Sequence, residues 1–277
     1  MSTTTVQSSQ IVDRPPLPAR GWPRERVVGT ALVALWGLMG IGLVLYLFNA
    51  WNPALFEKYA PLYLRGVGVT LTLVSVSMVV GALLSVPIAY ARMAKNRLLN
   101  GLAYGYVYFF RGTPLLAQTF LIYYGLGSFR PQLEAVGLWT FFREAWYCGV
   151  LAFSLNTAAY QAEILRGAIE SVSKGQWEAA AALGLSKFQT MRKIILPQAL
   201  IVALRPYGNE IILMIKGSAI IAIITVYDLM GETRRAYSRT FDFQTYLWAA
   251  LIYLSMVETL RNAVDWVERR ITRHLKR

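Results

Sequence analysis

The sequence has 277 residues, of which 56% are hydrophobic and 16% are charged, and its formal net charge is +13. Its apolar residues gather into runs of roughly 20 residues, the length that a helix needs to cross a bilayer. The basic residues lie between these runs, so we interpret them as charges that orient a membrane protein and not as a nucleic-acid-binding surface. A single cysteine, Cys148, excludes an internal disulfide, and with a single histidine, His274, no metal site is expected.

The apolar runs predict an all-α integral membrane protein. Residues 1–26 are polar and rich in proline, which is typical of a disordered tail. About six transmembrane helices are expected after it, at 27–48, 66–90, 102–125, 146–168, 200–226 and 244–267.

Basic residues indicate the orientation of these spans. With the N-terminus inside, the cytoplasmic segments carry more than twice as many Lys and Arg residues as the outer segments. An excess of Lys and Arg on the cytoplasmic side is the usual pattern of multi-pass proteins. The sequence therefore predicts that both termini are cytoplasmic.

Polar residues inside the spans are the first candidates for function, because an ionisable side chain at membrane depth is costly. In the third span, Arg111 precedes Pro114, which would free a backbone carbonyl and bend the helix. In the fourth, Asn156, Tyr160 and Glu163 share one helix face, with Thr157 beside them.

The fifth span is unusually polar. Arg205, Asn209 and Lys216 fall on one stripe, which Glu210 and Ser218 flank. Carboxylates could hold the ammonium of a zwitterion, and basic side chains its carboxylate. The candidate substrate path comprises Arg111, Asn156, Thr157, Tyr160, Glu163, Asn209, Glu210, Met214, Lys216 and Ser218. The alternative is a set of structural ion pairs and interface contacts.

The longest inside loop, 169–197, predicts a helix, a sharp turn and a second helix. Ser173 with Gln176, and Ser186 with Gln189, fit capping boxes. Gly184 can end the first helix in a left-handed conformation, and Pro197 suits the first turn of the next span. At helical spacing, Trp177, Ala181 and Leu185 could fill a groove on a partner. The alternative is an ordinary amphipathic surface helix.

The residues of this loop match a known signature. Glu178-Ala179-Ala180, Gly184 and Ile194-x-Leu196-Pro197 resemble the signature loop of ABC-importer permeases. Further stretches resemble the polar-amino-acid branch of that family, closest to the permease subunits for histidine, lysine, arginine and ornithine and for opines. These stretches are Phe110–Gln118, Leu155–Ile164 and Asn209–Ala219.

The resemblance implies the type I ABC-importer permease fold over residues 60–270. The helix expected at 27–48 departs from the family, whose members usually have five core spans, and we interpret it as a peripheral brace. It implies a coupling helix that docks on an ATPase subunit through Trp177, Glu178, Ala179, Ala180, Gly184 and Leu185. It also implies a location in the bacterial inner membrane and no catalytic residues.

The implied partners are two ATP-binding subunits, a second permease chain (a copy or a sister subunit), a periplasmic amino-acid-binding protein and the lipid bilayer. The chain lacks the G-x-x-x-x-G-K-[ST] phosphate loop, so no cofactor is expected on it, and ATP and Mg are expected on the partner ATPase.

Two other functions fit a polytopic membrane protein. A secondary transporter driven by an ion gradient would need an inverted repeat and a midplane ion site, and no repeat is evident. A structural subunit without transport activity would not need polar stripes within its spans. The resemblance implies import of polar amino acids, with basic ones favoured, and the sequence does not name the substrate.

Overall fold

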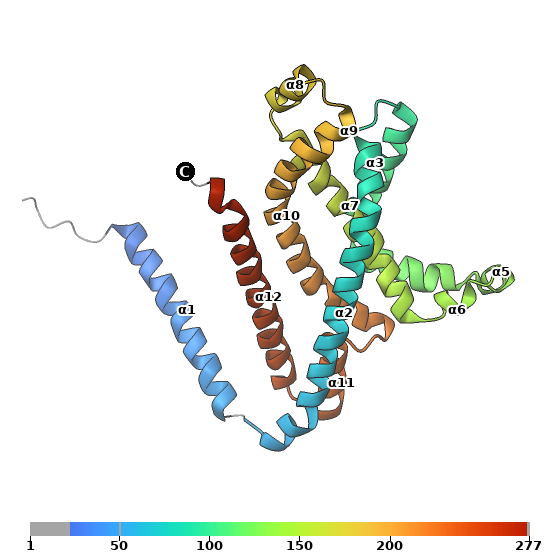
Figure 1. Ribbon diagram of the computed structural model, residues 1–277. Helices are drawn as coiled ribbons and strands as arrows, with labels where there is room; N and C mark the ends of the chain where they lie inside the picture. The colour runs from blue at the N-terminus through green and yellow to red at the C-terminus, as the bar shows by residue number, and fades with distance from the viewer. Residues whose placement is uncertain (1–22, 50, 276–277) are drawn as a thin grey trace, which may run out of the picture. The chain divides into compact units, whose positions relative to one another are not determined.

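The computed structural model describes residues 23–49 and 51–275, and in these ranges the chain forms helices joined by short connections (Figure 1). The expected all-α fold is therefore confirmed. The chain divides into two compact units, which meet in sequence at Asn52 and Pro53.

The first unit contains one helix, α1 (Arg24–Asn49). It has 26 residues and would extend about 39 Å, and its most apolar 18-residue stretch has a mean hydropathy of 2.3, enough to cross a bilayer. The helix begins slightly before the predicted span because the carbonyl of Pro23 accepts the amide of Val27 at 3.1 Å, which forms the first turn directly after the proline. Of the predicted tail, residues 1–22 lie outside the described residues.

The second unit is built around two long helices, α2 (Pro53–Arg92) and α7 (Ala145–Glu170). They approach closely at Gly81, where an added Cβ would lie 2.4 Å from Cγ2 of Thr157. The main apolar core lies along this contact, with Leu73 from α2 and Phe153 from α7 fully buried. The 40 residues of α2 extend about 60 Å, well beyond the predicted span at 66–90.

The predicted third span is two helices and not one. Helix α3 (Arg97–Gly112) ends at Thr113, and α4 (Leu115–Phe120) and the π-helical turn η1 (Leu121–Gly125) follow Pro114. The side-chain amide of Gln118 donates to the carbonyls of Phe110 (2.9 Å) and Thr113 (3.1 Å). The bend expected at Pro114 is a full break between two helices, and Gln118 satisfies the carbonyls exposed there.

The last two predicted spans correspond to α10 (Leu196–Gly217), extended by the 3-10 turn η3 (Ser218–Ile224), and α12 (Gln244–Ile271). Among the described residues, three helical segments are both long and apolar enough to cross a membrane: Arg24–Asn49, Pro53–Arg92 and Lys187–Ile224. With 26 and 28 residues, α7 and α12 have the length for a span but carry more polar side chains.

Short helices occupy the connections: α5 (Arg130–Ala135), α6 (Trp139–Phe142), α8 (Lys174–Ala182), α9 (Lys187–Thr190), the π-helical turn η2 (Met191–Ile195), α11 (Leu229–Thr240) and the C-terminal turn η4 (Thr272–Leu275). In the second unit, α8 and α9 lie at one end and α11 at the other (Figure 1). The predicted loop signature and the connection before α12 are thus on opposite ends of the bundle.

Candidate functional site

The turn after α8 has the geometry that its sequence predicts. Gly184 adopts φ +69°, its amide donates to the carbonyl of Ala181, and the amide of Leu185 donates to that of Ala180 at 3.1 Å. This pair of bonds is the Schellman motif, which needs a left-handed residue after the helix. The turn therefore fixes the direction in which the chain leaves α8.

Only one of the two predicted capping boxes forms. Ser186 and Gln189 exchange side-chain and backbone hydrogen bonds at the start of α9, as expected. Ser173 stands at the N-cap of α8, but its side chain makes no capping bond. The prediction for Ser173 was right about where the helix begins and wrong about the bond.

The predicted coupling residues divide between the surface and the interior. Glu178, Ala179 and Gly184 are exposed and Leu185 is half-buried. Ala180 is 1% exposed and so cannot enter a groove on a partner, whereas Trp177 is half-buried against the cluster of Ile169, Val172 and Ile195. The loop folds back on the end of α7, which the helical spacing did not indicate.

Two apolar side chains that the sequence reasoning missed stand out on this loop. Leu183 is 77% exposed and Phe188 is 71% exposed, on either side of the turn at Gly184. Their position next to the helix-ending glycine is the signal that could have identified them. Like Glu178, both side chains are accessible at the surface of the loop.

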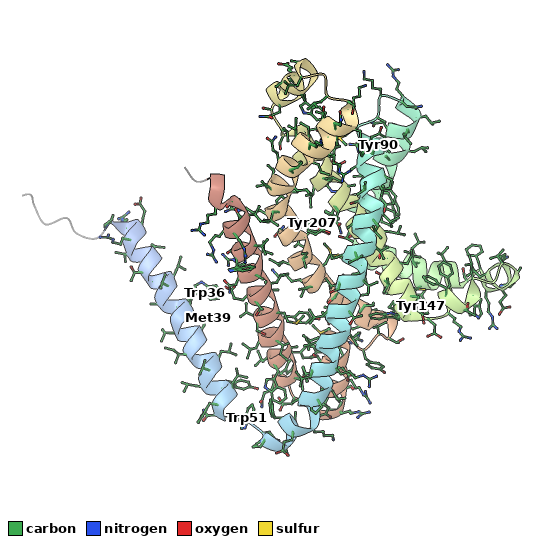
Figure 2. The ribbon with its side chains drawn as sticks, in the orientation of Figure 1. Trp36, Met39, Trp51, Tyr90, Tyr147 and Tyr207 are labelled. Carbon is green, nitrogen blue, oxygen red and sulfur yellow. The ribbon has the colours of Figure 1, made fainter. Side chains whose placement is uncertain are left out.

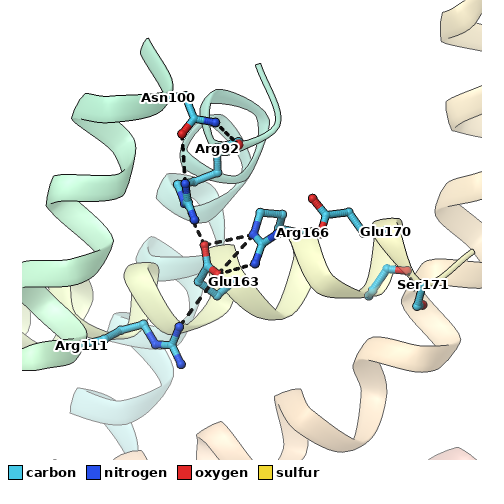
Figure 3. A network of polar contacts seen from close by, with 8 residues as sticks. Arg92, Asn100, Arg111, Glu163, Arg166, Glu170 and Ser171 are labelled. Atoms are coloured by element: carbon cyan, nitrogen blue, oxygen red, sulfur yellow. Dashed lines mark hydrogen bonds and ion pairs between the residues drawn. The ribbon is translucent and has the colours of Figure 1, made fainter. Parts of the chain in front are cut away.

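Glu163 is the centre of an ion network that joins three helices (Figure 3). Its Oε1 accepts from Nε of Arg92 at 3.0 Å, its Oε2 accepts from Nη2 of Arg166 at 2.8 Å, and Nη1 of Arg111 lies 3.9 Å from Oε2. Arg166 also binds Glu170 at 2.6 Å. The network ties the ends of α2 and α3 to α7.

This geometry favours the structural alternative for Glu163 over contact with a cationic substrate. The carboxylate is 14% exposed and already faces three guanidinium groups, so it has little free capacity for an incoming ammonium. Arg111 is the loosest member, because its side chain is 44% exposed and its guanidinium also lies 5.2 Å from the ring of Tyr160. In the sequence, Arg92 is one of the basic residues that indicate the orientation of the spans, and no local pattern connects it to Glu163.

Asn156 lies on the face of α7 that packs against the break between α3 and α4. Its amide donates to the carbonyl of Phe110 and to Oε1 of Gln118, both at 2.9 Å. Asn156 and Gln118 are both buried. The side chain therefore stabilises the break at Pro114, and Gln118, a polar residue inside an apolar run, is the partner that the sequence reasoning missed.

A second buried network joins α7 to α10. The hydroxyl of Thr157 donates to Oε1 of Glu210 at 2.9 Å, and the amide of Gln161 donates to the hydroxyl oxygen of Thr157 at 3.1 Å. The hydroxyl of Tyr207, on α10 (Figure 2), donates to Oε1 of Gln161 at 2.8 Å. Glu210 is 5% exposed. Its carboxyl group accepts this bond from Thr157 and has no ion pair within 4 Å among the described residues.

The predicted stripe on α10 is open. Arg205, Asn209 and Lys216 are all exposed, as residues on one face should be. Arg205 binds Glu268 of α12 at 2.7 Å, whereas Met214 and Ser218 are buried. Asn209 and Lys216, with Leu213 (50% exposed) between them, are therefore the part of the stripe that can contact a solute or a second chain.

Comparison with known proteins agrees with this architecture. Residues 78–273 match the family described as "Binding-protein-dependent transport system inner membrane component". The chain is 45% identical over 217 residues to the nopaline transport system permease protein NocM of Agrobacterium fabrum, covering 78% of this chain and 90% of the relative. It is 39% identical over 201 residues to the arginine ABC transporter permease protein ArtM of Haemophilus influenzae, covering 72% and 88%.

Solved structures show the same fold. A chain from the crystal structure of an amino acid ABC transporter with histidines is 36% identical and superposes with a TM-score of 0.70, covering 79% of this chain and 99% of that one. The inward-facing MetNI methionine ABC transporter is 21% identical with a TM-score of 0.65, covering 78% and 99%, which is a likeness of fold.

Proposed function

This chain belongs to the family of binding-protein-dependent transport system inner membrane components, and we propose that it is the permease subunit of an ATP-driven importer of polar amino acids, with basic amino acids the first candidates. Family membership makes it a multi-pass membrane transport subunit and not an enzyme. Such subunits work with an ATP-binding subunit and a substrate-binding protein.

The observation that carries the choice of substrate is the similarity to amino-acid transporters along most of the chain. The relatives named for nopaline and arginine transport are 45% and 39% identical, and the amino acid transporter structure is matched over 99% of its chain. An importer of amino acids must pass a zwitterion, and the bundle carries both carboxylates and basic side chains. An ion-gradient-driven transporter would leave this similarity unexplained.

The translocation path would lie along the open face of α10. Asn209 and Lys216 face outward from the isolated chain, and a charged side chain facing lipid would be costly. A second permease chain, either a copy or a sister subunit, would cover this face and enclose the path. Two permease chains and two ATP-binding subunits would then form one transporter.

The loop 169–197 would couple the path to ATP. Leu183 and Phe188 are large apolar side chains at the tip of the bundle, and they would enter a groove on the ATP-binding subunit with Glu178 at the rim. Because the chain has no G-x-x-x-x-G-K-[ST] sequence, ATP and Mg would bind the partner. With α8 on the cytoplasmic side of the bacterial inner membrane, both termini would be cytoplasmic.

Uptake by the reconstituted complex tests the substrate. Proteoliposomes that contain this chain, its ATP-binding partner and the binding protein are offered radiolabelled arginine, lysine, histidine, glutamine and glutamate separately. We expect accumulation of at least one of them, with arginine, lysine or histidine fastest. Accumulation of none of the five would contradict an amino-acid importer.

A further inference from the structure

A cavity of ≈500 Å³ lies at the end of the bundle opposite α8, where η3, α11 and the start of α12 meet. Its lining includes the tyrosines Tyr227, Tyr237 and Tyr246, the arginines Arg234 and Arg235, and Ser238. A cavity of this size is within the range of small-molecule sites. It is separate from the open face of α10 and from the network of Glu163.

The two arginines of the cavity have weak partners within the described residues. Nη1 of Arg234 lies 3.4 Å from the carbonyl oxygen of Ala222, and Nη1 of Arg235 lies 3.6 Å from Oε2 of Glu232. By contrast, Arg166 in the Glu163 network has a contact at 2.8 Å. A guanidinium group has five N–H donors in a planar fork, so most donors of Arg234 and Arg235 remain available to a ligand.

The charge open to the cavity is positive. The nearby carboxylates are sealed in the protein, because Glu232 is 2% exposed and Asp228 is fully buried. Asp228 accepts the amide of Gly231 at 2.8 Å and the hydroxyl of Tyr253 at 3.3 Å. Glu232 balances Arg235 from inside, which leaves the guanidinium groups to face an anionic ligand from the open side.

The backbone at the rim of the cavity is also unusual. Thr225 adopts φ +67°, a left-handed conformation that is rare for a β-branched residue and that persists where the surrounding structure enforces it. It joins η3 to the segment that carries Tyr227, whose ring lies 5.5 Å from the guanidinium carbon of Arg235. The strained turn thus helps to place an aromatic wall beside the arginine.

We infer that this cavity is an entry site that binds the α-carboxylate of a free amino acid through Arg234 and Arg235 before the molecule reaches the path along α10. The tyrosine rings would contact the side chain without selecting it, so the site would accept amino acids of different charge. The inference rests on the proposed function, because a carboxylate site at this end serves transport only if the chain carries amino acids inward from that side.

Binding of radiolabelled L-arginine and L-glutamine to the intact complex in lipid nanodiscs, without binding protein, tests the site. Both amino acids should bind, and agmatine, which is arginine without the carboxylate, should fail to compete. Arg234→Gln should weaken binding of both amino acids about tenfold or more, since it removes a charge-assisted contact. Arg235→Lys, which keeps the charge beside Glu232, should weaken binding less.

Arg239→Gln is the matched control, because Arg239 is exposed on the same helix and is not among the residues that line the cavity. It should bind both amino acids as the unmodified complex does. Unchanged binding in Arg234→Gln, equal competition by agmatine, or no binding without the binding protein would overturn the site.

Two further readouts separate the possible failures. If Arg234→Gln loses stimulation of ATPase activity by the binding protein but binds arginine normally, the cavity recognises that protein and the amino-acid site is refuted. If the unmodified complex accumulates amino acids with ATP while the binding experiment fails, only the entry site is wrong. If it accumulates none, the proposed function fails as well.

Discussion

Replacement of Glu163 by Gln tests whether the charged cluster on α7 is structural. The change keeps the shape of the side chain but removes the negative charge that holds Arg92 at 3.0 Å and Arg166 at 2.8 Å. Removing one partner of a buried ion pair costs about 3–5 kcal/mol, because the other charge stays desolvated. Since Glu163 is 14% exposed and Arg166 is 26% exposed, water relieves part of this cost, and we expect about 3 kcal/mol.

The measurement is the thermal stability of the detergent-purified complex, together with uptake of arginine and of glutamine. Glu163→Gln should lower the midpoint of unfolding and the yield of folded complex, and should reduce uptake of both amino acids to the same extent. Glu170→Gln is the control, because Glu170 also binds Arg166 but is 52% exposed, so its loss should cost only about 0–1 kcal/mol. A Glu163→Gln complex of normal stability that loses only arginine uptake would refute the structural account and place the carboxylate in the substrate path.

Three further predictions follow from the turn, the helix contact and the orientation. Gly184→Val strains a residue at φ +69° and should leave the chain inserted while uptake and co-purification of the ATP-binding subunit fall; normal ATP-driven uptake would contradict this. Gly81→Ala places a Cβ against Thr157 and should destabilise the complex by about 1–3 kcal/mol in thermal unfolding, whereas Gly68→Ala meets open space and should have little effect; equal stability of the two would argue against the contact. A cysteine in the 126–145 connection should react with an impermeant thiol reagent from outside, and reaction only from the cytoplasmic side would reverse the proposed topology.

The helical architecture could be predicted from the sequence because each predicted span is a local feature. Apolar runs locate α1, α2 and α10, and the missing amide of Pro114 predicts a distortion at the place where α3 and α4 separate. The positive φ at Gly184 was predictable for the same reason, since a glycine after a strong helix former is a local signal. Helix α11 was missed because its polar residues have no apolar run to mark them.

The candidate site was less predictable because its contacts are distant in sequence. Glu163 and Arg92 are 71 residues apart, and spacing along α7 could show only that Glu163 shares a face with Asn156 and Tyr160. In the structure, Asn156 and Glu163 on that face have partners within the chain, which the spacing could not show. Partial burial of Trp177 likewise depends on the loop folding back onto Ile169 and Ile195, a tertiary contact that helical spacing does not encode.

The dependence of amino-acid uptake on ATP is the most direct test of the account. Proteoliposomes that contain the purified chain with its ATP-binding partner are supplied with binding protein and radiolabelled amino acids, with ATP or a non-hydrolysable analogue on the side of the ATP-binding subunits. We predict accumulation only when ATP and the binding protein are both present, and none with the analogue. Accumulation driven by a proton or sodium gradient without ATP would contradict the assignment of this chain as the permease of an ATP-driven importer.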